Sequence, residues 1–367
     1  MALSAAAAGN YPSNDYWCER MILFSIGMPS RFAEWCDALT GRLAECSLGA
    51  VESATLNTLE ELAAIVLRTK ASHLVACSRQ PVVRLQSEII ASQRPYLVAI
   101  GDPRSALRNL SERMGQSVPE ATRAVASSCA AILRLTRSPG ALVMTGDDTA
   151  DPIAIGSAIA GHFELAATPD QIAAAVRELC EEGPLADQVE DSVWWDGLGD
   201  RERAVINGAL LPYLPGADAK PMLWEPELFF INEDPPAPAP VSATRHVDIT
   251  GRARFLVYGP FINLPPGSWT ANIVLGFSAE AAGMSFMVEI FAGHQLCTTR
   301  VEPPGEQITE VNLNFVIDHS VDQPVQVRIV NERPAFDGRL ALGQITLAPR
   351  AAISSETRDR LAAVLSE

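Results

Sequence analysis

Two turns in the first half of the sequence carry residues suited to binding an anion. One turn, residues 27–31, follows the apolar run 21–26, and the other, residues 101–104, follows the apolar run 96–100. Each turn leads into a helix-compatible segment whose first backbone amides face the turn. Such amides offset the charge of a phosphate or sulfate, together with a nearby hydroxyl or guanidinium group. We therefore predict a cofactor or ligand site built from Ser30, Arg31, Asp102 and Arg104.

The elements that position these turns alternate between strand and helix patterns. Apolar runs at 21–26, 73–77, 96–100 and 141–145 are separated by segments with helical periodicity, and the chain turns helical from Pro152 onward. Alternation of this kind predicts parallel strands joined by right-handed crossovers, with ligands at the carboxyl ends of the strands. We predict an α/β parallel-sheet domain over residues 21–220, preceded by a flexible tail at 1–20.

The second half of the sequence has a different period. Residues 221–243 are proline-rich and predict a linker. Beyond them apolar residues recur at every second position, as in 269–277 and 311–317, and Gly/Pro clusters separate these runs. This pattern predicts an all-β sandwich of jelly-roll type over residues 244–350, and residues 351–367 predict a short C-terminal helix.

Composition and charge exclude several classes of partner. The formal net charge is −16, which argues against nucleic acid or an anionic membrane surface as the main partner. No apolar run approaches the roughly 18 to 20 residues needed to span a bilayer. The seven cysteines form no C-x-x-C pair, and the N-terminus has no basic leader, so we expect a cytoplasmic protein with reduced thiols. The five histidines lack metal-site spacing, so we expect no metal.

The order of four motifs in the first domain resembles the sulfotransferase superfamily. The motifs are residues 23–31, 98–110, 142–152 and 159–171. That family has a P-loop-like α/β fold and uses the sulfate donor 3′-phosphoadenosine-5′-phosphosulfate (PAPS), releasing the bisphosphate PAP. The resemblance implies that Ser30 and Arg31 occupy the phosphosulfate loop and that Asp102 and Arg104 belong to the element that holds the 3′-phosphate.

The sequence departs from the family pattern at the donor site. The loop lacks the expected glycine, and Glu34 adds a carboxylate that would repel a phosphate. The arginine and serine that hold the 3′-phosphate in the family are replaced by Gly101 and Asn109. Segment 76–79 lacks the lysine and histidine from which a catalytic base could come, so the catalytic residues stay unknown. Each lost charge-assisted phosphate contact weakens binding by about 1.5–3 kcal/mol.

The opening of the second domain resembles carbohydrate-binding-like β-sandwiches attached to bacterial glycan enzymes. The resemblance lies in residues 248–269. Sugars stack on aromatic side chains, so Tyr258 and Trp269 are candidate ligand-binding residues. The favoured alternative is structural, with Trp269 in the core and Tyr258 across a sheet edge. Arg252 and Arg254 either bind an acidic sugar or bridge to carboxylates within the domain.

Three functions follow from these patterns. The first is a sulfotransferase-like protein with degenerate PAPS-binding motifs, non-catalytic or altered, that recognises or modifies bacterial surface polysaccharide. The second is an active PAPS-dependent carbohydrate sulfotransferase with a donor site rebuilt around Ser30, Arg31 and Arg104. The third is a structural assembly module. The expected partner is a carbohydrate or a protein of glycan synthesis, and homo-oligomer formation stays open.

Overall fold

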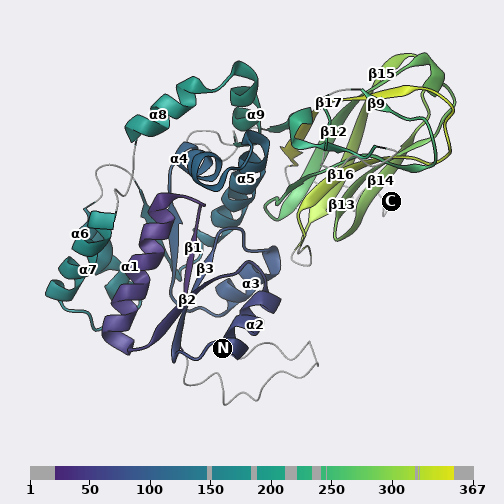
Figure 1. Cartoon of the computed structure of the whole chain (residues 1–367). Coiled ribbons are helices and arrows are strands. Elements are labelled where there is room, and N and C mark those ends of the chain that lie inside the picture. Colours follow the sequence, from purple (N-terminus) through teal and green to yellow (C-terminus); the bar gives the residue numbers. More distant parts are fainter. Residues whose placement is uncertain are drawn as a thin grey trace, which may run out of the picture. The chain divides into compact units, whose positions relative to one another are not determined.

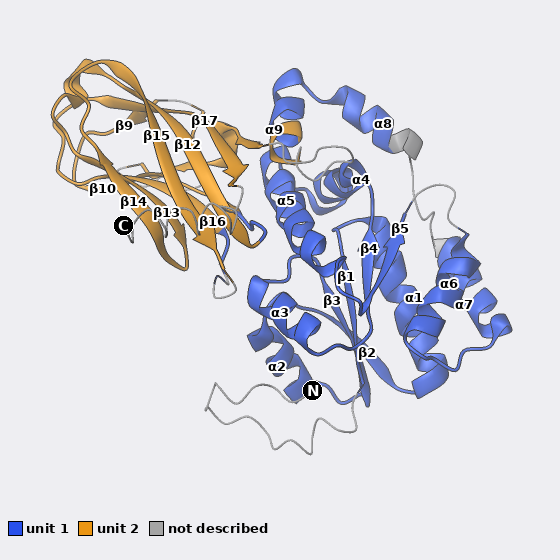
Figure 2. Cartoon of the chain, turned by 180° about the vertical axis from the view of Figure 1, so that it is seen from behind, with its two compact units in different colours: residues 1–206, 262–265, 319–324 blue, residues 207–261, 266–318, 325–367 orange. Residues whose placement is uncertain are grey.

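The computed structural model divides the chain into two compact units (Figure 2). It describes residues 21–146, 151–182, 188–210, 221–233, 241–244, 246–318, 321 and 323–350. Unit 1 comprises residues 1–206, 262–265 and 319–324, and unit 2 comprises 207–261, 266–318 and 325–367. The predicted N-terminal tail and C-terminal helix lie outside the described residues and stay predictions.

Unit 1 is an α/β unit built on a five-stranded parallel sheet (Figure 1). Its strands are β1 (Ile22–Gly27), β2 (Val51–Thr55), β3 (His73–Ser78), β4 (Tyr96–Ile100) and β5 (Ala141–Thr145). Its first helices are α1 (Arg31–Leu48), α2 (Leu59–Arg68), α3 (Val83–Ala91), α4 (Pro103–Arg108) and α5 (Val118–Leu135), with a π-helical turn η2 (Asn109–Arg113) directly after α4. The later helices are α6 (Pro152–His162), α7 (Pro169–Glu182), α8 (Gln188–Gly197) and α9 (Asp200–Leu210), the last of which runs into unit 2.

The strand order places a crevice where the sequence predicts one. The order is β2-β3-β1-β4-β5, so β1 and β4 are neighbours although the chain leaves β1 toward β2 and reaches β4 from β3. Because the connections diverge on the two sides of this pair, the carboxyl ends of β1 and β4 form the position where open α/β sheets bind ligands. The two turns singled out in the sequence follow these two strands.

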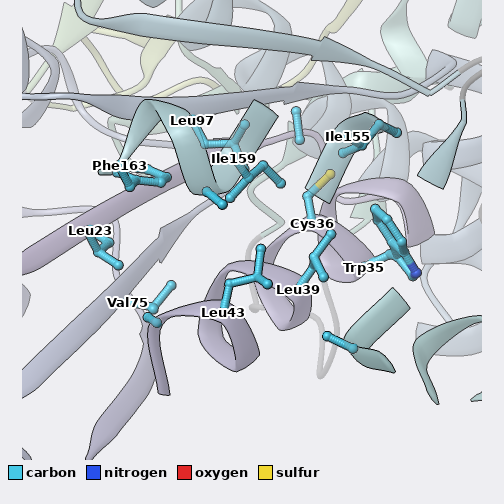
Figure 3. Packing of buried hydrophobic residues seen from close by; sticks show 14 of the residues in the cluster. Leu23, Trp35, Cys36, Leu39, Leu43, Val75, Leu97, Ile155, Ile159 and Phe163 are labelled. Atoms are coloured by element: carbon cyan, nitrogen blue, oxygen red, sulfur yellow. The ribbon is translucent and has the colours of Figure 1, made fainter. Parts of the chain in front are cut away.

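A buried apolar cluster holds α1, α6 and α7 against one face of the sheet (Figure 3). Alternate residues of the central strands supply the sheet side of the cluster, namely Leu23, Val75 and Leu97. Residues at helical spacing supply the other side, including Leu39 and Leu43 of α1. On the opposite face, Tyr96 donates its hydroxyl to the Leu135 carbonyl of α5 at 2.7 Å. The cluster fixes where α1 begins, and therefore fixes the turn that precedes it.

Unit 2 is a sandwich of two antiparallel sheets, which confirms the predicted all-β domain. Among the described residues, one sheet has the order β14-β13-β16-β10-β7-β8 with β11 beside β16, and the other has the order β15-β12-β17-β6 with β9 beside β17. The strands of the first sheet are β14 (His294–Val301), β13 (Phe286–Ala292), β16 (Val325–Asn331), β10 (Arg254–Tyr258), β7 (Phe230–Ile231), β8 (Val241–Ser242) and β11 (Pro260–Ile262). Those of the second are β15 (Gln307–Ile317), β12 (Gly267–Phe277), β17 (Arg339–Pro349), β6 (Met222–Trp224) and β9 (Val247–Asp248).

Two segments differ from the sequence-based expectation. Residues 51–55 were not expected as a strand but form β2, an edge strand none of whose residues is fully buried. Residues 221–243 were expected as a linker, yet β6 and β7 lie within them and pair with β17 and β10. Trp224 is wholly buried. The described part of this segment is therefore a component of the sandwich core.

Within the described residues no helix combines the length and the apolar character needed to cross a membrane.

Candidate functional site

The Ser30 turn caps its own helix. Ser30 is wholly buried, and its Oγ accepts a hydrogen bond from the Ala33 amide at 3.3 Å as the N-cap of α1. A serine at this position satisfies one of the amides that an anion would otherwise bind. The hydroxyl oxygen that the sequence predicts at a phosphate site therefore accepts from the helix itself.

Glycines at the strand ends allow side chains to fill the crevice. A Cβ atom added at Gly101 would lie 2.7 Å from Ser30 Oγ, and one added at Gly27 would lie 2.6 Å from Ala33 Cβ. A Cβ atom at Gly146, which follows β5, would collide with the ring of Phe32. These approaches are closer than packed atoms allow, so the α1 turn is pressed directly against the ends of β4 and β5.

The Asp102 turn has the same self-capped character. The Asp102 carboxylate accepts from the Arg104 amide at 2.8 Å and caps α4. The Arg104 guanidinium carbon lies 4.4 Å from the centre of the Trp195 ring in α8, a cation–π stack. Asp102 and Arg104 are exposed, and Arg31 is half-buried at the start of α1. The four predicted residues thus lie on the two turns at the β1–β4 crevice, but three of them serve contacts within the protein.

Arg108 is the central cation of this region, and sequence reasoning missed it. It is 6% exposed, and its guanidinium donates to Glu112 at 2.9 Å and to Asp191 of α8 at 2.7 Å. Burial raises the pKa of the Asp191 carboxyl above its usual range, and the nearby Arg108 charge opposes that rise. A carboxylate of the protein therefore occupies the place on Arg108 that an anionic ligand would take.

A second carboxylate, that of Glu34, is hydrogen-bonded to the neighbouring donor groups. Glu34 of α1 accepts from Arg113 at 3.2 Å and from the Asn109 side-chain amide at 3.4 Å. Asn109 also donates to the Pro29 carbonyl at 3.1 Å, and Arg113 donates to Asn109 at 3.0 Å. From the sequence, the Glu34 carboxylate was predicted to repel a phosphate. The structure shows it bound to the cationic and amide donors nearby.

The space left between these groups is small. A cavity of about 20 Å³ remains, lined by Arg31, Ser105, Arg108, Asn109, Glu112, Arg113 and Asp191. Room for one water needs about 10–15 Å³, and small-molecule pockets span roughly 300–1,000 Å³. The cavity has room for about one water and none for a nucleotide.

The polar side chains around the ends of β1 and β3 are engaged within the protein. Asp37 of α1 accepts from Ser25 Oγ at 2.5 Å and is paired with Arg79. Ser78 is buried and donates to Asn57 at 2.9 Å. Burial raises the pKa of the Cys77 thiol far above its usual range, which keeps the sulfur protonated and unreactive. This network ties β1, α1 and β3 together structurally.

The four candidate residues of the sandwich lie in different environments. Trp269 is buried in the core on β12, whereas Tyr258 is half-buried on β10 of the other sheet, in ring contact with Phe230 and Phe261. Arg254 donates to the carbonyls of residues 232, 250 and 248 at 3.3, 2.9 and 2.8 Å, and Arg252 is exposed. The two aromatic residues lie on different sheets, and a ligand-binding role for the four stays a prediction.

No group of three His, Cys, Asp or Glu side chains suited to a metal ion occurs in the parts of the chain that the structure describes.

No family model matches the sequence, and no curated protein matches it. Solved structures similar in fold include mouse sulfotransferase SULT7A1 complexed with PAP, which is 8% identical with a TM-score of 0.39, covering 55% of this chain and 86% of that chain. They also include the carbohydrate-binding module TmCBM61 with β-1,4-galactotriose, 11% identical over 35% of this chain and 87% of that one, with a TM-score of 0.23. The C-terminal CBM6 of LamC from Zobellia galactanivorans is 17% identical over 28% and 75%, with a TM-score of 0.19. These low identities and TM-scores identify no relative whose function transfers to this chain.

Proposed function

We propose that this chain is a sulfotransferase-like protein that has lost the use of PAPS and recognises bacterial surface polysaccharide through its sandwich. The observation that carries the loss of the donor is the Asp191–Arg108 pair at the β1–β4 crevice, which leaves a cavity of about 20 Å³. Ser30 and Arg104, which would have to hold the donor, are engaged by Ala33 and Trp195.

An incoming phosphate would have to displace the carboxylates that these donors already bind. On Arg108 it would exchange the charge-assisted contact with Asp191 for another of the same class, each worth about 1.5–3 kcal/mol, so the exchange returns little net free energy. The donor would also have to displace Glu34 from Arg113 and Asn109. Each step therefore replaces a contact already made inside the protein.

Calorimetric titration of the full-length protein with PAP and with PAPS tests this half of the proposal. We expect no heat of binding at millimolar nucleotide. Micromolar affinity for either compound would refute it, and transfer of radiolabelled sulfate from PAPS to a polysaccharide would establish the active carbohydrate sulfotransferase instead.

The polysaccharide half of the proposal is supported by the sandwich. Its opening stretch, residues 248–269, resembles carbohydrate-binding-like domains, and its outward sheet surface carries side-chain amides and hydroxyls on neighbouring strands. Retention of the protein by immobilised polysaccharide tests this half separately. A failure of retention would refute it whatever the nucleotide result.

A further inference from the structure

An open groove of about 570 Å³ lies on unit 2, where β12 ends and β15 and β17 begin. Two of its lining residues, Gly276 and Ala341, have little or no side chain, and we call these two residues the groove floor. Ile308 is 79% exposed at its side. The groove is therefore accessible to a chain lying across the outward face of the second sheet.

A row of polar side chains continues from the groove along β12 and β15. Asn272 donates to Asn312 at 3.1 Å and to Glu310 at 3.3 Å, and Thr270 donates to Asn314 at 2.8 Å. We call these five residues the polar ladder. The strand register pairs Gly276 with Ile308, Asn272 with Asn312, and Thr270 with Asn314, so the groove floor and the ladder share one sheet face.

The spacing and chemistry of this surface suit a repeating, polyhydroxylated chain. Residues of one strand on the same face repeat about every 7 Å, so positions 270 to 276 extend over about 20 Å. Amide and hydroxyl groups both donate to and accept from the hydroxyls of a glycan, and a carboxylate accepts from them. Ile308 and the small residues of the floor offer apolar contact for the C–H faces of such a chain.

The charges of the surface select against an anionic chain. Among the charged groups described along the groove and ladder, Glu306, Glu310 and Arg339 are all exposed, so the carboxylates outnumber the arginine. The whole chain carries a formal charge of −16. A uronate-rich or sulfated polymer would be repelled at long range, whereas a neutral one would not.

We propose that the groove and the polar ladder bind a neutral polysaccharide. This inference rests on the proposed function, because it names the surface and the class of glycan that polysaccharide recognition would use. Hydroxyls of the glycan contact Asn272, Glu310 and Asn312, while the chain crosses the floor at Gly276.

Native affinity electrophoresis of the full-length protein tests the proposal. The gels contain neutral polymers (dextran, galactan, xylan or galactomannan) or anionic ones (polygalacturonate or dextran sulfate). We expect retardation by at least one neutral polymer and by neither anionic polymer. Gly276→Leu fills the groove floor and should weaken retardation at least tenfold. Its Cβ meets Ala341 Cβ at an ordinary 3.5 Å, so we expect the variant to fold.

Matched variants keep the test decisive. Gln295→Leu places the same side chain at an exposed position on β14 of the other sheet and should leave retardation unchanged. Glu310→Gln changes the ladder rather than the groove floor and should weaken retardation several-fold, so it tests the site even if Gly276→Leu fails to fold.

The outcomes separate the two proposals. Retardation unaffected by Gly276→Leu and Glu310→Gln would overturn this site and leave polysaccharide recognition standing, and retardation by anionic polymers alone would overturn the neutral class. No retardation by any polymer would overturn both proposals. Self-association abolished by Gly276→Leu, without glycan binding, would assign the groove to a second copy of the chain.

Discussion

The β1–β4 crevice of unit 1 and the outward groove of unit 2 are opposites in how they use polar groups. In the crevice, Arg108 is bound to Asp191 and Glu112, and the cavity left over is about 20 Å³. On the sandwich, Asn272 and Asn312 bond across an exposed sheet face beside a groove of about 570 Å³. Buried polar groups satisfied from within stabilise the fold, whereas exposed ones exchange readily with a ligand. The difference teaches that the position where open α/β sheets commonly bind ligands can be filled by the protein's own side chains, while an open polar surface lies elsewhere in the chain.

The largest expected effect is on the stability of the crevice. Arg108→Ala leaves the buried Asp191 carboxyl without its cation, which should lower the free energy of unfolding by about 3–5 kcal/mol. Arg113→Ala, whose side chain is 51% exposed, should cost about 1 kcal/mol or less. Urea denaturation of both variants measures this, and equal losses would contradict a buried, internally neutralised crevice.

The next largest change in stability is expected from the close packing of the strand ends. Gly27→Ala forces a Cβ to within 2.6 Å of Ala33 Cβ, so we expect a loss of about 1–3 kcal/mol from overpacking. Gly161→Ala in α6, where a Cβ meets nothing within 4 Å, should instead stabilise by about 0.4–1 kcal/mol. Thermal unfolding of the pair checks the contrast, and a Gly27→Ala variant as stable as the wild type would show that the crevice has room.

The raised pKa of Asp191 predicts a pH dependence. Because burial raises this pKa in the folded state, the folded protein holds a proton that the unfolded chain releases, and stability from this group falls as pH rises from the usual aspartate range through the raised value. Relative to Asp191→Asn, the wild type should therefore gain stability when the pH is lowered from 7 to 4. Unfolding free energies of both proteins at several pH values test this, and the opposite trend would mean that pairing with Arg108 outweighs burial.

The smallest expected effect is on the polar ladder. Asn272→Ala removes bonds that are solvent-exposed, so the free energy of unfolding should change by no more than about 0.5 kcal/mol. A loss above 2 kcal/mol, measured by urea denaturation, would show that the ladder stabilises the sheet. It would contradict the contrast between the ladder and the crevice.

Local patterns in the sequence predicted most of the fold. The two-residue period over 269–277 is encoded within a few positions, and β12 confirms it. Strand β2 was missed because its sequence, Val-Glu-Ser-Ala-Thr, contains no apolar run of the kind that marks β5. The sites were harder to predict, since Asp191 meets Arg108 across 83 residues of sequence. Only tertiary packing brings these two residues together, and no periodicity reports it.

A crystal of the protein soaked in millimolar PAP tests the central claim most directly. We expect that Asp191 stays on Arg108, that Glu34 stays on Arg113, and that no nucleotide density appears at the ends of β1 and β4. Density for PAP at that position, with α8 displaced and the Arg108 guanidinium on a phosphate, would contradict it.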